Sequence, residues 1–164
     1  MSETRVDQIT LLKTLLTNTN HANQLSIMYA AWASVYTTGS EYLKKIVLQV
    51  ISEPSPTHKR DIEFAVARMG VTNPYFIARQ FVSVKAGGSL DDLNFRSFSM
   101  LNIENEQAYH HACVAISLIN GGHMCLSSHV GSLQASNETD ENIDCSMRIA
   151  AASHSLNILG RGDE

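Results

Sequence analysis

Thiol and imidazole side chains gather in one short stretch of this sequence, around Cys125. A pair of glycines comes just before His123, and Cys125 and His129 follow. From residue 107 to residue 137 there is no Asp, Glu, Lys or Arg, yet four of the seven histidines and two of the three cysteines fall there. A stretch that keeps titratable side chains but no permanent charge is typical of a sheltered site. We therefore expect the chemistry of the protein to be found here.

The cysteine is expected to react as a thiolate, with His129 as its base. If a helix begins just after Gly122, Cys125 lies in its first turn, and His129, four residues on, lies on the same face. A helix N-terminus stabilises a neighbouring anion by about 0.3–1 kcal/mol, whereas lowering the pKa of a thiol by two units requires about 2.7 kcal/mol. Burial works in the opposite direction. An adjacent imidazole that accepts the thiol proton is therefore required, and His129 is the candidate.

The same side chains allow a second chemistry, the binding of a metal ion. Zinc is held in proteins by nitrogen and sulfur ligands, and this part of the chain supplies His110, His111, His123, Cys125 and His129. The sequence contains neither a Cys-x-x-Cys pair nor a His-Glu-x-x-His pattern. A metal site is therefore the weaker alternative.

The other two cysteines, Cys113 and Cys145, are expected to be ordinary core residues. Each is predicted to lie in the middle of a helix among apolar neighbours, where a free cysteine behaves as a small apolar side chain. Three cysteines without the spacing of a disulfide framework do not indicate a secreted protein. We expect a cytoplasmic protein, in a reducing compartment where a thiol is free to act.

Length and composition predict one domain over residues 1–164. A chain of 164 residues with 44% apolar residues is long enough for one well-packed core and too short for two independent domains. The net charge is −4 and the basic doublets are limited to Lys44-Lys45 and Lys59-Arg60, so nucleic acid is not expected as a partner. The N-terminus lacks the apolar segment of a signal peptide, and the uncharged stretch is too polar to span a membrane.

Apolar residues recur with helical spacing along nearly the whole chain, and strand signals are absent. We therefore predict an all-α helical bundle. Helix starts are indicated by Ser55-Pro56, Asn105 and Thr139. The predicted helices span residues 7–16, 23–36, 40–51, 56–69, 74–84, 90–100, 106–119, 123–135 and 140–159.

Two neighbouring features predict a break after residue 69. Gly70 is placed as a C-cap glycine would be, and Asn73-Pro74 repeats the pattern that starts a helix. Residues 65–70 and 115–120 then each end a helix ahead of a turn and a new helix. Duplication of a helical unit would explain this similarity.

The residues from Ile119 to His129 resemble the active-site segment of the alkyl hydroperoxidase D (AhpD)/carboxymuconolactone decarboxylase superfamily. The family pattern there is a Glu, eleven further residues and then Cys-x-x-Cys-x-x-x-His. The similarity extends to residues 67–76, 91–93 and 100–103, and it covers most of the chain. It implies an AhpD-like helical bundle and a thiol antioxidant protein that reduces alkyl hydroperoxides.

In this family, the second cysteine attacks the peroxide and becomes a sulfenic acid. The first cysteine resolves it as a disulfide, which a lipoylated partner reduces, while the Glu and the His move protons. Position by position, the resemblance implies that Cys125 is the attacking cysteine and His129 the motif His. Gly122 stands at the place of the resolving cysteine and His110 at the place of the Glu. His110 and His123 are then the candidate proton relay, and no cofactor is implied.

The glycine at position 122 leaves a sulfenic acid at Cys125 without an adjacent thiol to condense with. The expected function is peroxide reduction or redox sensing through a single cysteine, with an external thiol or a lipoyl protein as reductant. The alternatives are a catalytically silent AhpD-like paralogue that acts as a binding or assembly protein, and a metal- or haem-binding helical protein. Family members assemble, and Trp32, Phe76 and Phe81 offer apolar surface, so a homo-oligomer is expected.

Overall fold

The computed structural model describes residues 2–18 and 24–162, which form helices joined by turns and loops. No β-strand occurs in these two ranges, so the predicted all-α fold is confirmed. Asn23, where the second helix was expected to begin, lies outside the described residues. The elements are η1 (Glu3–Arg5), α1 (Val6–Thr17), α2 (Gln24–Thr38), α3 (Glu41–Leu48), α4 (Pro56–Phe81), η2 (Leu90–Leu93), η3 (Phe98–Leu101), α5 (Glu106–Asn120), α6 (His123–Ala135) and α7 (Asp140–Gly160).

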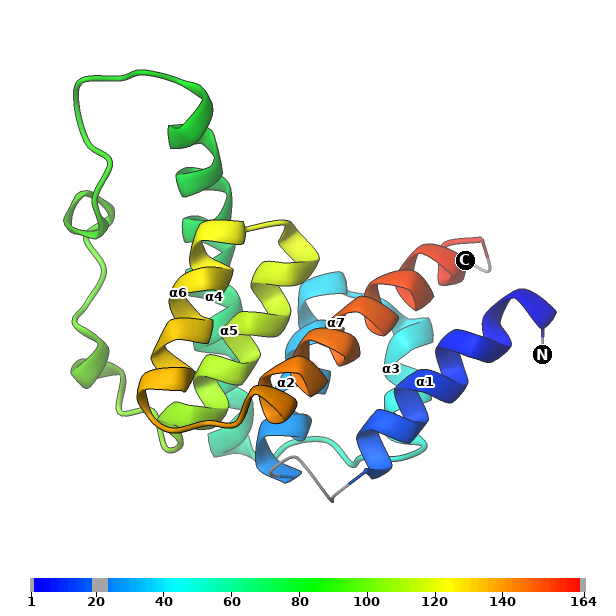
Figure 1. Cartoon of the computed structure of the whole chain (residues 1–164). Coiled ribbons are helices and arrows are strands. Elements are labelled where there is room, and N and C mark those ends of the chain that lie inside the picture. Colours follow the sequence, from blue (N-terminus) through cyan, green and yellow to red (C-terminus); the bar gives the residue numbers. More distant parts are fainter. Residues whose placement is uncertain (1, 19–23, 163–164) are drawn as a thin grey trace.

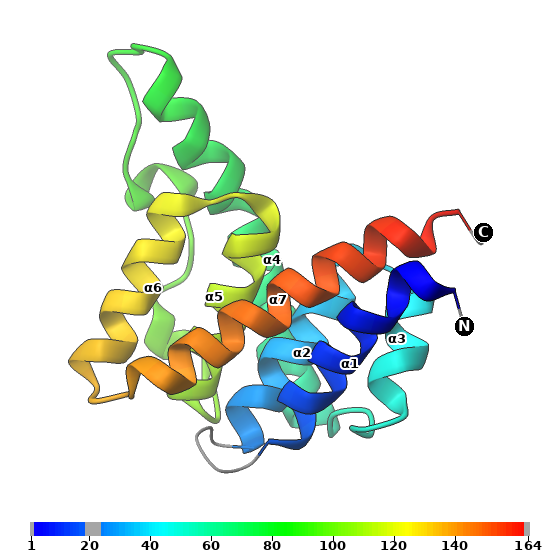
Figure 2. The ribbon, with the colours of Figure 1, turned by 45° about the vertical axis from the view of Figure 1, so that its right-hand side comes forward.

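Helices α2 and α5 occupy the centre of the bundle, and the other helices pack around them (Figure 1). α2 contacts α4, α5 and α7, while α5 also contacts α4, α6 and α7. α1 and α3 pack against α7, and Figure 2 shows α7 running past α2 and α1. The helix that carries Cys125, α6, is held mainly by α5 and α4.

α2 is buried on almost all sides, which explains why it contains no charged residue. Tyr29 and Trp32 are fully buried together with three neighbouring alanines, whose small side chains let other helices approach closely. The Trp32 indole N–H donates a hydrogen bond to the carbonyl of Ser52 at 3.0 Å. Trp32 therefore offers no surface to a partner chain, and the expectation that it does is wrong.

The uncharged stretch of the sequence covers two helices with different surroundings. α5 is buried from Ala108 to Ser117 apart from the half-buried His110, and charged residues are excluded from such a helix unless they are paired. Packing alone explains the absence of charge there. In α6, by contrast, Leu133 is the single buried residue. The lack of charge on this more exposed helix is not explained by packing.

Three predicted helix starts are confirmed by hydrogen bonds from their capping side chains. Each bond satisfies one of the N–H groups that the first turn of a helix leaves without an intrahelical partner. The acceptor and donor pairs are Ser55 and the N–H of His58 (3.3 Å), Asn105 and the N–H of Ala108 (2.8 Å), and Thr139 and the N–H of Asn142 (3.2 Å).

Helix α4 runs without a break from Pro56 to Phe81, so the predicted stop at Gly70 and new start at Pro74 are wrong. A proline inside a helix costs about 3 kcal/mol, because it removes an N–H donor and crowds the preceding turn. Gly70 and Pro74 lie on the exposed side, whereas Asn73 is buried and hydrogen-bonded to α5. These tertiary contacts hold the helix together through the proline. Since residues 65–70 do not end a helix, the basis for the predicted duplication is lost.

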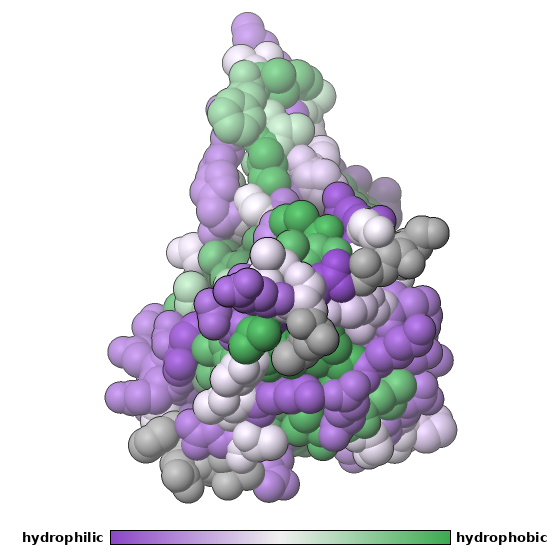
Figure 3. All heavy atoms as spheres, turned by 90° about the vertical axis from the view of Figure 1, so that its right-hand side faces the viewer, coloured by the Kyte–Doolittle hydropathy of each residue, from purple (hydrophilic) through white to green (hydrophobic). Residues whose placement is uncertain are grey.

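The end of α4 and the segment after it form an arm, residues 75–97, that projects beyond α5 and α6 (Figure 1). The arm turns back at Gly87 and Gly88, whose φ values of 70° and 98° suit glycine. The Tyr75 hydroxyl accepts a hydrogen bond from the N–H of Gly88 at 2.8 Å, and Arg79 donates to two carbonyls that lie just before this turn. In Figure 3 hydrophobic atoms lie along this projecting part, at the top of the view.

Candidate functional site

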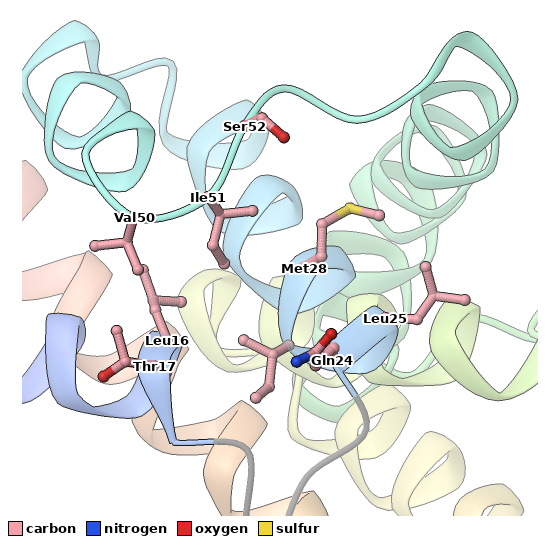
Figure 4. A pocket seen from close by; sticks show the side chains of 9 residues that line it. Leu16, Thr17, Gln24, Leu25, Met28, Val50, Ile51 and Ser52 are labelled. Carbon is pink, nitrogen blue, oxygen red and sulfur yellow. The ribbon is translucent and has the colours of Figure 1, made fainter.

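A cavity of about 720 Å³ opens between α1, α2 and the segment that follows α3 (Figure 4). Leu16, Met28, Val50 and Ile51 surround the hollow, together with a few uncharged polar side chains. No lining residue is charged, and none is a His or a Cys. The residues that line this cavity therefore offer no group for nucleophilic or acid–base chemistry.

A second cavity, of about 350 Å³, contains the reactive side chains, and we call it the thiol cavity. It lies between α4, α5, α6 and the arm, and Phe98 of η3 completes its wall. Three of the four predicted site residues, His110, Cys125 and His129, line it. The full set of lining residues is Arg68, Met69, Thr72, Phe76, Leu90, Phe95, Phe98, Tyr109, His110, Met124, Cys125, Ser128 and His129.

The fourth predicted residue, His123, lies apart from the other three. It is the first residue of α6, its side chain is exposed, and it does not line the thiol cavity. Of the two histidines expected to form the relay, His110 shares a cavity with Cys125 and His123 does not.

Cys125 is the third residue of α6 and is half-buried at the cavity wall. The preceding Gly122 has no side chain with which to cap the helix, so the first N–H groups of α6 lack a side-chain acceptor. This end of the helix favours a negative charge on a nearby group. In the part of the chain that the structure describes, no hydrogen bond ties the Cys125 thiol to another side chain, so the thiol is free to meet a ligand in the cavity.

His110 and His129 form a hydrogen-bonded pair across α5 and α6. Their Nδ1 atoms are 2.9 Å apart and their ring centroids 5.2 Å apart. One of the two Nδ1 atoms must donate and the other accept. On its other side, His110 Nε2 lies 3.6 Å from a carboxylate oxygen of Glu106, one turn earlier on α5. Glu106, His110 and His129 thus form a row that begins at the exposed Glu106 and ends at the cavity.

Burial decides the protonation of this pair. It lowers the pKa of His129 to about 4, with the charge of His110 adding to the effect. Burial also lowers the pKa of His110, although Glu106 opposes this change. Both rings are therefore neutral at neutral pH. When His110 directs its Nε2–H at Glu106, its Nδ1 accepts from the Nδ1–H of His129, and the Nε2 of His129 is left free to take a proton.

Aromatic rings close the cavity around the pair and supply this burial. The ring of Phe98 stacks on that of His110 with centroids 6.3 Å apart and an interplanar angle of 19°. Tyr109 meets His110 edge-on at 5.8 Å. Burial against these aromatic rings removes the imidazoles from water, which explains why the charged form of both is disfavoured.

Arg68 and Glu106 are further residues of the site, and sequence reasoning missed both. Arg68 on α4 brings a guanidinium to the thiol cavity, donates a hydrogen bond to the carbonyl of Arg96 and lies over the Phe95 ring at 5.0 Å. Glu106 has a sequence signal, since it precedes His110 by one helical turn. Arg68 has none, because it comes from a distant segment.

Asn73 fills the space that a side chain at position 122 would need. A Cβ atom added at Gly122 would lie 2.6 Å from Asn73 Cγ and 2.9 Å from its Cβ. Asn73 cannot easily yield, because Nδ2 donates to Ser117 Oγ and Oδ1 accepts from Asn120 Nδ2, both at 3.1 Å. The glycine is therefore a packing requirement of this chain, and a side chain at position 122 has no room.

His111 belongs to a buried structural network and does not line the thiol cavity. Its Nε2 lies 2.8 Å from a Glu138 carboxylate oxygen, and its Nδ1 lies 2.7 Å from the Ser146 hydroxyl. Burial raises the pKa of Glu138, but hydrogen bonds from His111, Asn142 and a backbone N–H together lower it by more than burial raises it. The net shift of the pKa is therefore downward. Because an ionised carboxylate only accepts, His111 Nε2–H donates.

A metal centre finds no support in the geometry. Within residues 2–18 and 24–162, no group of three or more His, Cys, Asp or Glu side chains is arranged to hold a metal ion. His111 already uses both ring nitrogens in hydrogen bonds. Cys113 and Cys145 are buried free thiols, as predicted.

Comparison with known proteins assigns neither a family to the chain nor a function to this site. The sequence matches no model of a known protein family, and no curated protein matches it. In the two described ranges, no helix combines the length and the apolar character that crossing a membrane requires.

Proposed function

We propose that the protein reduces or senses hydroperoxides through Cys125, in the manner of an AhpD-like thiol antioxidant protein. One observation carries the proposal: Cys125 and the His110–His129 pair meet at the wall of a single cavity. Neutral histidine beside a free thiol is the arrangement in which an imidazole takes the thiol proton. The resemblance of residues 119–129 to the AhpD active-site segment supports the same chemistry.

The oxidation step assigns a role to each group. His129 Nε2 accepts the thiol proton, and His129 in turn passes its Nδ1 proton to His110, whose imidazolium faces Glu106. The Cys125 sulfur then donates an electron pair to the terminal oxygen of the hydroperoxide, forming an S–O bond while the O–O bond breaks. The departing alkoxide recovers the proton through the same relay. The products are a sulfenic acid at Cys125 and an alcohol.

The cavity walls indicate which hydroperoxide fits. Phe76, Phe95, Phe98 and Met124 make the interior mainly apolar, and its volume of about 350 Å³ accommodates a small organic molecule. Arg68 is the cation at the same wall. We therefore propose an alkyl or aryl hydroperoxide as substrate. Regeneration requires a thiol or lipoyl-protein reductant, which a reducing compartment such as the cytoplasm provides.

Peroxide consumption tests the proposal. The purified protein is mixed with cumene hydroperoxide and dithiothreitol, and peroxide loss is followed for the wild type and for Cys125→Ser. We expect consumption that Cys125→Ser abolishes and that Cys145→Ser, a change at a buried thiol that does not line the cavity, leaves intact. Wild-type consumption no faster than that of Cys125→Ser, together with a Cys125 thiol that peroxide does not modify, would overturn the proposal.

We also propose that the chain forms a homo-oligomer through the arm and the exposed first turn of α6. Phe81 is 80% exposed, and Val82, Val84 and Leu90 of the same arm are each more than half exposed. Met124 adds apolar surface on a helix without charged residues, the composition expected in the buried centre of an interface.

Sedimentation velocity distinguishes the outcomes for the oligomer. Phe81→Ser in the arm should shift the wild-type protein to a smaller species. Ile158→Ser, which removes an exposed apolar side chain from α7, should not. A wild-type monomer would contradict the proposal.

A second candidate function, a binding protein without turnover, is favoured by the packing of Asn73 against Gly122. This contact permanently excludes the resolving thiol of the AhpD pattern. Under this alternative, the wild type and Cys125→Ser bind cumyl alcohol equally well and neither consumes peroxide. Ligand titration by NMR beside the peroxide assay separates the two functions.

A further inference from the structure

We infer that Cys113 is the resolving thiol for Cys125, so that peroxide oxidation closes a disulfide between α5 and α6. The inference rests on the proposed function and adds a second reacting residue to the site. It replaces the missing thiol at position 122 with one from the facing helix.

The pairing of α5 with α6 sets these two cysteines opposite each other. The helices are joined by the turn at Gly121-Gly122 and run in opposite directions. Near the turn, the N–H of Gly122 donates to the carbonyl of Ser117 at 2.7 Å. Farther from it, His110 meets His129. Both pairs fit one antiparallel register, in which Cys113 faces Leu126, the residue after Cys125. Cys113 therefore lies against the turn of α6 that contains Cys125.

The neighbouring residues show which side each cysteine takes. Val114 belongs to a small separate core against which Leu126 and Val130 of α6 pack. Cys125, one residue before Leu126, packs instead against the main core, which contains Cys113. The two thiols therefore lie on the same side of the contact between the helices.

Tyr109 links the buried thiol to the cavity. Its side chain lines the thiol cavity, and Cys113 follows one helical turn later on α5. Burial raises the pKa of Cys113, the neighbouring Tyr109 hydroxyl opposes this rise, and the charge of Cys125 adds to it. Cys125 is thus near enough to act on the charge of the buried thiol.

The resolving step needs no further oxidant. After the hydroperoxide has oxidised Cys125 to a sulfenic acid, the Cys113 sulfur attacks the Cys125 sulfur, forming the S–S bond as the S–O bond breaks. The hydroxyl leaves with the Cys113 proton as water. A dithiol such as dithiothreitol then reduces the disulfide and returns both thiols. The raised pKa of Cys113 slows this step, because the thiolate is the attacking form.

Cys145 is the matched control, because it lies on α7 and not on either of the two helices that the proposed disulfide joins. It is buried on α7, and the charges that shift its pKa, after burial itself, belong to Arg148 and Asp144 of the same helix.

The experiment treats the reduced full chain with one equivalent of cumene hydroperoxide, blocks remaining thiols with N-ethylmaleimide and maps peptides by mass spectrometry. We expect a disulfide joining the peptides of Cys113 and Cys125 in the wild type and in Cys145→Ala. In Cys113→Ala and Cys113→Ser, the disulfide should be lost and a sulfenic acid at Cys125 should persist, trapped by dimedone. Circular dichroism checks that both variants fold.

The outcomes distinguish a failure of the Cys113 inference from a failure of the proposed function. A wild-type sulfenic acid at Cys125 that persists without a Cys113 link, or a disulfide to Cys145 or to a second chain, would overturn the inference and leave the proposed function standing. A Cys125 thiol that stays unmodified would overturn both.

Discussion

The Nδ1 atoms of His110 and His129, on two different helices, lie 2.9 Å apart and share one hydrogen bond. Since only one of the two atoms carries the proton, a second proton arriving at His129 Nε2 displaces the first toward His110. The exposed Glu106 beside His110 then compensates the new charge. The pair therefore moves a proton away from the cavity without holding it on His129, whose burial disfavours the charged ring.

Replacing His129 should slow the oxidation of Cys125. His129→Gln removes the atom that takes the thiol proton, and loss of a general base lowers a rate by about 100-fold or more. His110→Gln should cost less, because His129 Nε2 remains. The measurement is the rate of sulfenic acid formation at pH 7, followed by dimedone trapping. Exposed His154→Gln is the control, and equal rates in His129→Gln and the wild type would rule out a base at this position.

Acid should destabilise the fold through the same histidine. The pKa of His129 falls on folding from an ordinary value near 6.5 to about 4, so the unfolded chain binds its proton first as the pH decreases. The free energy of unfolding is then highest above pH 6.5 and declines between pH 6.5 and about 4. His110 and His111, whose pKa values burial also lowers, act in the same direction.

Urea denaturation at pH 7.5 and pH 5 measures this effect. His129→Gln should show a smaller loss of stability between the two pH values than the wild type, while His154→Gln should match the wild type. An unchanged pH dependence in His129→Gln would show that the ring is not buried in its neutral form.

Gly122 should not tolerate a side chain. Gly122→Ala brings a Cβ within 2.6 Å of Asn73 Cγ, and such overpacking costs about 1–3 kcal/mol. Gly131→Ala is the matched control within α6, because nothing lies within 4 Å of its Cβ, and it should stabilise the helix by up to about 1 kcal/mol. Thermal unfolding compares the two.

A double variant tests the cause of the Gly122 effect. If Asn73 is the obstacle, Gly122→Ala should cost less in an Asn73→Ala background than alone, because the two closest contacting atoms, Cγ and Nδ2, are gone and only the Asn73 Cβ remains. Additive losses would show that Gly122 is required for another reason.

Much of the fold could be predicted because its signals are local. The capping side chains at Ser55, Asn105 and Thr139 act on N–H groups three residues away, within the same helical turn. The break expected at Gly70 failed because Asn73 is anchored to α5, a contact distant in sequence. Local propensity is overridden in this way whenever tertiary contacts compensate for it.

In the site, too, residues close in sequence could be predicted, whereas residues brought together by helix packing could not. Cys125 and His129 lie one turn apart, so helical spacing alone puts them on one face. Arg68, by contrast, reaches the cavity only because α4 packs along α5 and α6. The packing of Asn73 against Gly122 was equally out of reach, since it depends on how closely α4 approaches the turn before α6.

Glu138 should be sensitive even to an isosteric change, because both carboxylate oxygens are used. One accepts from the side chains of Gln107 and His111, and the other from Asn142 and the backbone N–H of Thr139. Glu138→Gln must turn an NH₂ group toward one of these pairs of donors. A buried donor left facing another donor costs about 1–3 kcal/mol.

Thermal unfolding at pH 7 should therefore show Glu138→Gln clearly destabilised, whereas Glu141→Gln, an exposed residue of the first turn of α7, should change little. The ionised form of Glu138 is favoured in the folded state, so its contribution is present above its ordinary pKa and declines as the pH falls below it. The difference between Glu138→Gln and the wild type should accordingly shrink in acid. A difference that stays constant down to pH 3 would show that charge at Glu138 does not matter, and that the network is held by shape alone.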